Sequence, residues 1–206
     1  MRAATAELVI DCPERDARVT YQPGYLERPA ADALLAWMLR HTPWQREAPF
    51  VFGRVHAVRR QSFAYGEAGA RYRYSGVERS AEAWPAALGP LVRRLCEELR
   101  APFNFGLCNL YPDGDAQLGR HADAEAEILR DSPIAALSLG AARDFLLYDG
   151  DGRRVAARSL AHGSLLVMWG ASQRCFKHAI PRRRRVCAPR VSITFRALRE
   201  RARRER

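Results

Sequence analysis

Apolar residues recur at helical spacing in two segments of the first hundred residues. In the segments from Pro29 to His41 and from Trp84 to Arg100, apolar positions three and four apart form a single stripe. Pro85 lies early in the second segment, where a helix tolerates proline. The stripes consist of Ala30, Leu34, Leu35, Met38 and Leu39 in the first segment and of Leu88, Leu91, Leu95 and Leu99 in the second. The pattern predicts two amphipathic helices.

Short apolar or alternating runs predict β-strands, mostly in the second half of the chain. Before residue 100 the candidates are Leu8–Ile10, a loosely alternating run from Phe50 to Phe63, and Tyr72–Tyr74 followed by a turn. After Pro102, Gly, Pro and Asp separate six runs of strand-forming residues. These runs are Phe105–Tyr111, Ile134–Leu139, Asp144–Tyr148, Ser164–Trp169, Cys175–Ile180 and Arg190–Ala197.

This order of elements predicts an α+β fold. Six closely spaced strands favour an antiparallel barrel or a double-sheet jelly roll, and the preceding helices are expected to pack on one sheet face. The length of 206 residues fits one structural domain. Within it we distinguish an N-terminal part of helices and strands (1–100), a β core (101–198) and a basic tail (199–206).

Composition narrows the class of protein. The hydrophobic share of 48% and the charged share of 28% are typical of a globular chain, and no apolar run is long enough to span a membrane. The start of the sequence has no apolar segment typical of a secretory signal. Five cysteines without a Cys-x-x-Cys pair favour reduced thiols. We therefore expect a cytoplasmic protein, and a monomer because no coiled-coil pattern is present.

The net charge of +11 favours a polyanionic partner such as nucleic acid. The most concentrated charge is the run of four arginines from Arg182 to Arg185. A soluble basic protein without such a partner is the alternative that charge alone leaves open.

Two histidines and one carboxylate form a candidate metal site. His121 and Asp123 form a His-x-Asp pair after a turn-rich segment, and His178 lies within a predicted strand. Two imidazoles and a carboxylate are the ligands of the facial triad that holds non-haem Fe(II) and leaves coordination positions open. Taken singly, each histidine can equally well be structural.

A pair of arginines suggests a neighbouring anion site. Arg190 and Arg196 are six residues apart and therefore lie on one face of a strand. An arginine fork binds a carboxylate in two-point fashion. Asn109 and Tyr111 share a face of another predicted strand and can form a hydrogen-bonding wall. Solvated charges in an arginine-rich tail are the alternative interpretation of the two arginines.

Together these motifs resemble the AlkB-type Fe(II)/2-oxoglutarate dioxygenases, especially the members that act on alkylated DNA. The resemblance extends from about Val51 to Ala197. It rests on the order and approximate spacing of Asn109-x-Tyr111, His121-x-Asp123, His178 and Arg190-x5-Arg196, together with Phe103–Phe105, Ser132–Ile134, Gly140–Phe145, His162–Leu166 and Pro189–Arg196.

The resemblance implies a role for each of these side chains. His121, Asp123 and His178 would bind Fe(II), and Arg196 would pair with the distal carboxylate of 2-oxoglutarate. The rest of the cosubstrate site would consist of Arg190, Asn109 and Tyr111. At Ser192 the chain departs from the family, which usually has an asparagine there, and the shorter hydroxyl reaches less far. With O2 as the second cosubstrate, such a site hydroxylates an N-methyl group, which then leaves as formaldehyde.

The resemblance also implies a pocket for a flipped base. Tyr72, Tyr74 and Ser75 match the family's lid over the base, with His121 as the opposite wall. Glu125 lies where the DNA-repair members have an acidic residue close to the base. A carboxylate there favours cationic bases such as N1-methyladenine and N3-methylcytosine. The alternatives are two tyrosines in a half-buried strand and an ordinary acidic loop.

Three further positions are expected to contact DNA. Phe52 lies in a loop that resembles the aromatic wedge of a double-strand-specific homologue, and Arg60 lies where that homologue has a basic residue near the wedge. Arg183, within the four-arginine run, is expected to contact phosphates. A core position for Phe52 and a solvated loop around Arg183 are the alternatives.

We therefore expect a DNA-repair dioxygenase that demethylates N-alkylated bases. Two alternatives remain open from sequence. One is an RNA or protein demethylase on the same scaffold, and the other is a non-catalytic nucleic-acid-binding protein. The complete set of metal ligands together with both arginines argues against the second, because a pure binder has no use for a 2-oxoglutarate pocket.

Overall fold

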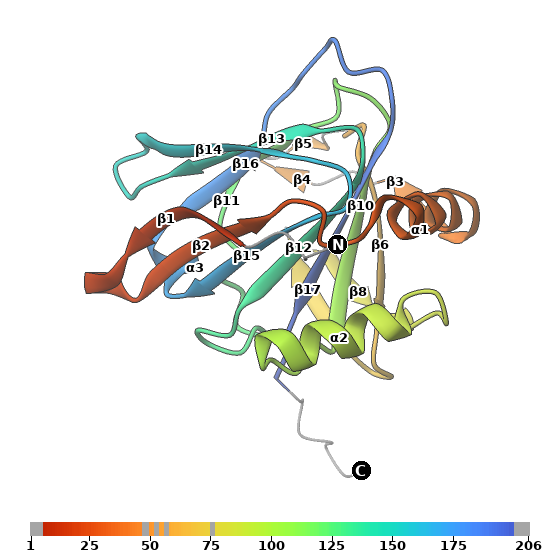
Figure 1. Ribbon diagram of the computed structural model, residues 1–206, viewed down its shortest axis with the longest axis horizontal. Helices are drawn as coiled ribbons and strands as arrows, with labels where there is room; N and C mark the ends of the chain where they lie inside the picture. Colours follow the sequence, from red (N-terminus) through yellow and green to blue (C-terminus); the bar gives the residue numbers. More distant parts are fainter. Residues whose placement is uncertain (1–5, 47–49, 52–53, 56–57, 75–76, 200–206) are drawn as a thin grey trace.

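The computed structural model describes residues 6–46, 50–51, 54–55, 58–74, 77–199, and its largest element is a mainly antiparallel sheet (Figure 1). The strands of this sheet are β1 (Glu7–Cys12), β2 (Ala17–Gln22), β3 (Gln45–Arg46), β6 (Gln61–Gly66), β9 (Glu82–Ala83), β10 (Phe105–Tyr111), β12 (Ile134–Gly140), β15 (Ser164–Gly170) and β17 (Arg190–Arg196). Their order is β1-β2-β15-β12-β17-β10-β6-β3, and β9 pairs with β6.

A smaller sheet faces the larger one and completes a jelly roll. Its strands run in the order β11-β16-β13-β14. They are β11 (Leu118–His121), β13 (Arg143–Tyr148), β14 (Arg154–Leu160) and β16 (Lys177–Ile180). Side chains of both sheets form one buried cluster, for example Leu107 and Leu166 from the larger sheet with Phe145 and Leu160 from the smaller. The predicted double-stranded β-helix is confirmed.

The alternation of side chains along the central strands divides the molecule into two layers of core. On β17, Val191, Ile193 and Phe195 point to the helical side, whereas the side chains of alternate residues line the space between the sheets. Leu107, Asn109 and Tyr111 of β10 line the same space. The polar residues of this inner face therefore lie in the interior of the jelly roll.

Two helices cover the outer face of the larger sheet. Helix α1 (Arg28–His41) and helix α2 (Gly89–Leu99) have buried apolar stripes that pack against this face. Helix α1 begins as expected. Helix α2 begins later than the expected Trp84, because Leu88 N–H bonds to Pro85 O in a separate turn and Pro90 occupies the first turn of the helix.

Several strands differ from the sequence-based expectation. The expected run from Phe50 to Phe63 is divided into β4 (Phe50–Val51), β5 (Arg54–Val55) and β6, and β4 and β5 form a two-stranded sheet with each other. Strands β2, β11 and β14 were not predicted. Cys175 belongs to a short helix, α3 (Ser172–Cys175), which precedes β16. A second separate hairpin, β7 (Arg71–Tyr74) with β8 (Val77–Ser80), contains the expected lid tyrosines, and a 3-10 turn (Pro13–Arg15) follows β1.

The N-terminal part and the β core share the larger sheet. Strand β2 pairs with β15 and strand β6 pairs with β10, so strands from before residue 100 extend the sheet on both sides. The division at residue 100 therefore runs through a single sheet. No helix among the described residues is long and apolar enough to cross a membrane.

Candidate metal and cosubstrate site

The three predicted metal ligands converge between the two sheets. His121 ends β11 and His178 lies on β16, and the two residues are directly paired in the sheet register. Asp123 follows two residues after β11. One possible ligand atom from each residue lies within 4.8 Å of the other two. The structure thus brings His178 next to the His-x-Asp pair, from which it is more than fifty residues away in the sequence.

Both imidazoles have surroundings that favour metal ligation. His121 Nδ1–H donates to Gly119 O at 2.9 Å, a bond that leaves Nε2 as the lone-pair nitrogen. Burial lowers the pKa of His178 to about 3, so this imidazole is neutral. The His178 ring stacks on Phe145, with the ring centroids 5.3 Å apart. Neutral imidazoles in fixed orientations are the form in which histidine binds a metal ion.

The carboxylate of Asp123 is ionised and only partly satisfied. Burial by itself would raise its pKa, but the charge of Arg196 holds the pKa below its ordinary value. Arg196 Nη2 donates to Asp123 Oδ2 at 2.7 Å. The other oxygen, Oδ1, is buried, lies 3.7 Å from His121 Nε2 and accepts no hydrogen bond from the residues described. Oδ1 is therefore the oxygen available to a cation.

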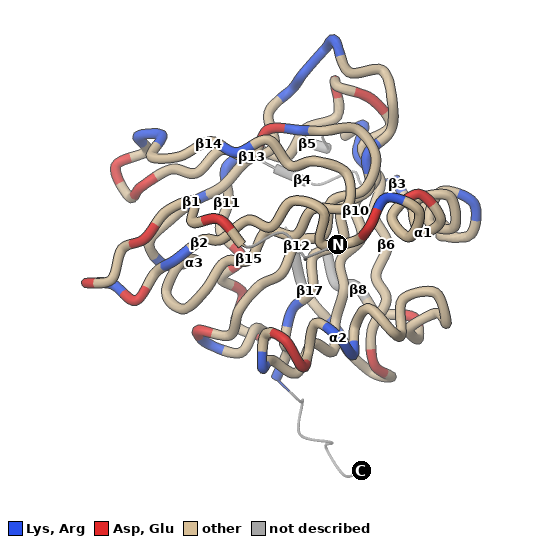
Figure 2. Tube along the Cα trace, viewed as in Figure 1, with Lys and Arg blue, Asp and Glu red and all other residues tan. Residues whose placement is uncertain are grey.

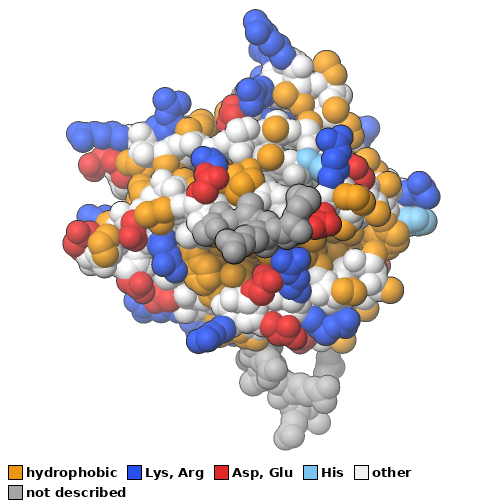
Figure 3. Space-filling model, viewed as in Figure 1, with side chains coloured by type: hydrophobic (Ala, Val, Ile, Leu, Met, Phe, Trp, Pro, Cys, Tyr) orange, Lys and Arg blue, Asp and Glu red, His pale blue; other side chains and the backbone are white. Residues whose placement is uncertain are grey.

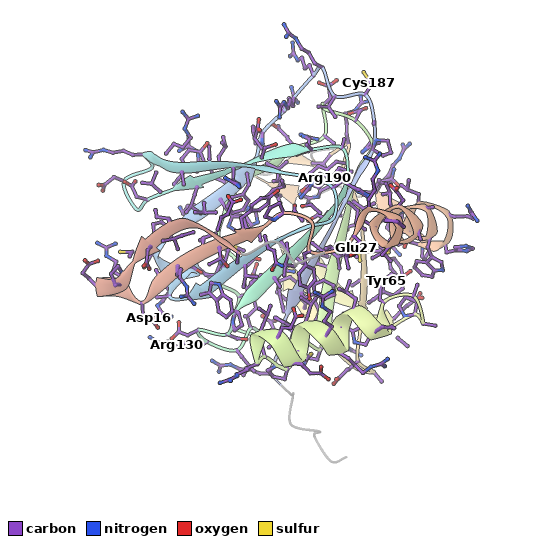
Figure 4. The ribbon with its side chains drawn as sticks, viewed as in Figure 1. Asp16, Glu27, Tyr65, Arg130, Cys187 and Arg190 are labelled. Carbon is purple, nitrogen blue, oxygen red and sulfur yellow. The ribbon has the colours of Figure 1, made fainter. Side chains whose placement is uncertain are left out.

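A cavity continues from the metal ligands to Arg190. Arg190 is fully buried, its Nη2 donates to Ser138 Oγ at 2.8 Å, and the Tyr111 ring lies 5.0 Å from its guanidinium carbon. In Figure 4 the Arg190 side chain lies inside the molecule, near the upper end of the larger sheet. Asn109 and Ser192 also line this cavity. All five predicted cosubstrate residues, Asn109, Tyr111, Arg190, Ser192 and Arg196, therefore border one space.

The residues present fit Fe(II) and a dicarboxylate. Two imidazoles and a carboxylate with one uncommitted buried oxygen are suitable donors for the metal. Nε and Nη1 of Arg190 are buried without a hydrogen-bond partner among the described residues. A buried guanidinium with unused donors is unfavourable unless an anion fills the space beside it. The cavity thus offers cation ligands at one end and anion donors at the other.

Arg196 lies in a different part of the cavity from the one expected. We expected this side chain to hold the distal carboxylate of the cosubstrate, but it contacts the metal ligand Asp123. The two arginines are six residues apart on an extended strand, or about 20 Å between their Cα atoms. Arg190 is therefore the arginine at the end of the cavity remote from the metal ligands.

Part of the expected base pocket lies next to Asp123. Tyr72 lies beside Glu125, and the Tyr72 ring packs against Phe105 and the Arg196 guanidinium. Burial raises the pKa of Glu125 above its ordinary value. Tyr72 is fully buried, so neither face of its ring is open to a stacked base in this structure.

The remaining predicted lid and wedge residues are Tyr74, Ser75 and Phe52. Tyr74 pairs with Val77 across the β7–β8 hairpin, which places it at the tip of that hairpin. Ser75 and Phe52 lie outside the described residues, so their roles stay predictions.

The expected DNA-contacting arginines have two different environments. Arg60 is only 5% exposed and lines the cavity together with the metal ligands, a position that disfavours direct contact with a DNA backbone. Arg183 is half-exposed and pairs with Asp144 at 3.0 Å. The run from Arg182 to Arg185 lies in the loop between β16 and β17, which projects at the top of the molecule (Figure 2), and its side chains extend into solvent (Figure 3).

Several residues at the site were not predicted. Ser138 alternates with Leu137 and Leu139 on β12, and this period of two could have identified it as an inner-face residue. Arg143 is fully buried and donates to the carbonyls of Asp113, Ala116 and Pro181. Gln173 accepts a hydrogen bond from the Asp123 amide. Neither Arg143 nor Gln173 has a sequence signal that reveals its partners.

Comparisons with known proteins agree with this site. Residues 18–196 match the model of the 2OG-Fe(II) oxygenase superfamily. The chain is 41% identical over 156 residues to the mouse protein named DNA oxidative demethylase ALKBH2, an alignment that covers 72% of this chain and 65% of that protein. For human ALKBH2 the identity is 40% over 156 residues, covering 72% and 60%. The chain thus spans less than two thirds of the length of these relatives.

A third relative and a solved structure extend the comparison. The chain is 31% identical over 196 residues to human alpha-ketoglutarate-dependent dioxygenase alkB homolog 3, covering 90% of this chain and 68% of that protein. The structure titled "The structure of OsALKBH1" has a similar fold, with a TM-score of 0.62 at 17% identity, covering 93% of this chain and 100% of that chain. The chain belongs to the 2OG-Fe(II) oxygenase superfamily and, within it, to the AlkB-type proteins.

Proposed function

We propose that this protein oxidatively demethylates N-alkylated bases in DNA, with Fe(II), 2-oxoglutarate and O2. The observation that carries the proposal is the shared cavity, in which the triad of His121, Asp123 and His178 lies at one end and the buried Arg190 at the other. The relatives named DNA oxidative demethylase support the choice of substrate.

The triad would hold the iron through His121 Nε2, Asp123 Oδ1 and an imidazole nitrogen of His178. When bound, Fe(II) and 2-oxoglutarate would allow O2 to act as the oxidant: one oxygen atom would hydroxylate the methyl carbon and the other would enter succinate as 2-oxoglutarate loses CO2. The protein itself holds the metal ligands in position. Arg196 keeps Asp123 ionised and occupies one of its oxygens, and β11 and β16 hold the two histidines in register.

The geometry supports an assignment in which Arg190, and not Arg196 as expected from sequence, binds the distal carboxylate. Arg190 would bind the carboxylate of 2-oxoglutarate that is distant from the metal, with Tyr111, Asn109 and Ser192 beside it. Arg196 would act on the metal carboxylate Asp123, which it already contacts. Ser138 would fix Arg190 by accepting its Nη2–H.

The surroundings of Glu125 support a cationic base as the substrate. Its carboxylate is half-buried beside Tyr72, and burial raises its pKa, so a negative charge is unfavourable there. A positively charged N1-methyladenine or N3-methylcytosine would stabilise that charge, whereas a neutral base would not. The arginine loop near the site would bind phosphates, a contact that does not distinguish DNA from RNA.

The test is a product assay on a single-stranded DNA oligonucleotide that contains one N1-methyladenine. With Fe(II), 2-oxoglutarate and ascorbate, we expect equimolar formaldehyde and succinate, and neither product from the His178→Ala protein. An RNA oligonucleotide of the same sequence is assayed in parallel. Succinate without formaldehyde on either oligonucleotide would contradict base demethylation and direct the search to a protein substrate. Nucleic-acid binding without either product would favour the non-catalytic binder.

A further inference from the structure

We infer that Gln173 is a positioning residue for the metal carboxylate Asp123. The Asp123 N–H donates to Gln173 Oε1 at 2.8 Å, and Gln173 comes from α3, fifty residues further along the chain. This inference rests on the proposed iron site. It adds a residue that neither touches the iron nor belongs to the His-x-Asp…His motif.

Asp123 requires an anchor of this kind because of its place in the fold. Strand β11 ends at His121, so Asp123 lies in a loop and has no partner strand for its amide. An unpaired amide at a buried position is unfavourable, and a loop without an amide bond would leave the carboxylate in several orientations. The side chain of Gln173 replaces the missing strand partner.

Gln173 is itself held in one orientation. Its Nε2–H donates to Met168 Sδ at 3.0 Å, which fixes which end of the side-chain amide faces Asp123. Helix α3 is tied to the β1–β2 hairpin, because Ala171 N–H donates to Asp16 O at 2.7 Å. The glycine before it, Gly170, has φ +53°, and an added Cβ there would lie 2.2 Å from Asp16 O. Helix α3 is therefore a fixed support that also leads directly into β16 and His178.

Two contacts of Asp123 leave one of its carboxylate oxygens available to a cation. Gln173 fixes the backbone amide, Arg196 occupies Oδ2, and Oδ1 has no hydrogen-bond partner among the described residues. Oδ1 lies 3.7 Å from His121 Nε2. Loss of the amide anchor would leave the carboxylate ionised but would allow it to move away from the histidines.

The test measures metal affinity in the absence of turnover. Mn(II), which has the same charge and accepts the same ligands, is titrated into the wild-type, Gln173→Leu and Gln173→Glu proteins and followed by electron paramagnetic resonance. Leucine has a similar size but no acceptor, so we expect Mn(II) affinity to fall by about tenfold. Glutamate retains an acceptor oxygen, so we expect affinity within about threefold of wild type. The exposed Gln117, changed to leucine, is the control for the substitution itself.

A second measurement separates positioning from a change in charge or stability. In the metal-free protein, amide hydrogen exchange at Asp123 should become faster in Gln173→Leu and remain slow in Gln173→Glu, while the melting temperatures stay close. Unchanged Mn(II) affinity or unchanged exchange at Asp123 in Gln173→Leu would overturn the inference. If the wild-type protein itself fails to bind Mn(II), the proposed metal site is refuted and the inference with it.

Discussion

At the scale of single residues, the two arginines of β17 differ in what balances their charge. Arg196 pairs with Asp123 at 2.7 Å, whereas Arg190 forms no ion pair with any residue that the structure describes and donates to the neutral Ser138. Burial lowers the pKa of Arg190, in line with an uncompensated charge. Substitution of Arg196 should therefore destabilise the protein, whereas substitution of Arg190 should not.

Removal of Arg190 should strongly weaken cosubstrate binding with little change in stability. In Arg190→Met, a buried charge without an ion-pair partner is replaced by an apolar chain, so the free energy of unfolding should change by no more than about 1 kcal/mol. The affinity for 2-oxoglutarate should fall by roughly 100-fold, because the carboxylate loses its charged partner. Thermal unfolding with Mn(II), in the presence and absence of 2-oxoglutarate, measures both effects. A variant that keeps its 2-oxoglutarate stabilisation would refute the assignment of Arg190.

Removal of Arg196 should instead destabilise the metal-free protein. The Arg196→Met change leaves the buried Asp123 carboxylate without its guanidinium, at an expected cost of about 3–5 kcal/mol in the free energy of unfolding. Urea denaturation of the metal-free protein gives this number directly. Equal stabilities of the Arg190→Met and Arg196→Met proteins would contradict the difference in charge balance described above.

At the scale of elements, the loop after β10 and the loop between β16 and β17 are hydrogen-bonded to each other through the backbone of Gly114. Gly114 N–H donates to Val186 O and Gly114 O accepts from Arg183 N–H, both at 2.7 Å. A Cβ at position 114 would lie 1.9 Å from Arg183 O. The arginine loop between β16 and β17 therefore depends on a close backbone approach that only glycine allows.

The Gly114→Ala change should release the arginine loop. We expect a loss of about 1–3 kcal/mol in the free energy of unfolding, since the backbones must separate. Trypsin should cleave faster after Arg182 to Arg185, as mass spectrometry of the early fragments would reveal. Gly150→Ala is the matched control, because a Cβ at that glycine meets nothing within 4 Å. Equal cleavage rates in the two variants would contradict the proposed role of Gly114.

The individual strands show how much of the fold could be predicted from the sequence, and why. Strand β10 has the predicted bounds, and the alternation along β17 places its arginines on one inner face, because a period of two is visible without any partner. Strand β14 was missed because arginine and alanine replace the usual strand formers in Arg154–Leu160. Strand β11 has only four residues, and its strand character depends on pairing with β16.

The candidate site could also be predicted only in part from the sequence. A motif identifies His121, Asp123 and His178, but their convergence depends on the β11–β16 register, which the sequence does not encode locally. Alternation places Arg196 on the cavity face, yet it cannot say that Asp123 is its partner, because that contact joins distant segments. For the same reason Gln173 was missed. The face of a strand on which a side chain lies follows from the local sequence. The residues that the side chain contacts depend on the tertiary structure.

At the scale of the whole molecule, the net charge of +11 predicts affinity for polyanions but not where they bind. Two exposed arginines in different parts of the described structure make it possible to distinguish binding at a specific site from attraction by the overall charge. Arg183 lies in the loop near the cavity and pairs with Asp144 at 3.0 Å. Arg28 lies at the start of α1, on the outer side of the larger sheet, and pairs with Asp32 at 3.7 Å.

Arg183→Ala and Arg28→Ala remove the same charge from these two places. If phosphates bind at the loop, Arg183→Ala should weaken binding of single-stranded DNA and reduce the slope of log affinity against log salt by about 0.7, the value for one phosphate contact. Arg28→Ala should leave the slope unchanged. Fluorescence anisotropy over a series of salt concentrations measures both. Equal slopes in the two variants would mean that DNA responds to the charge of the whole molecule, and the arginine loop would lose its assignment as the phosphate-binding element.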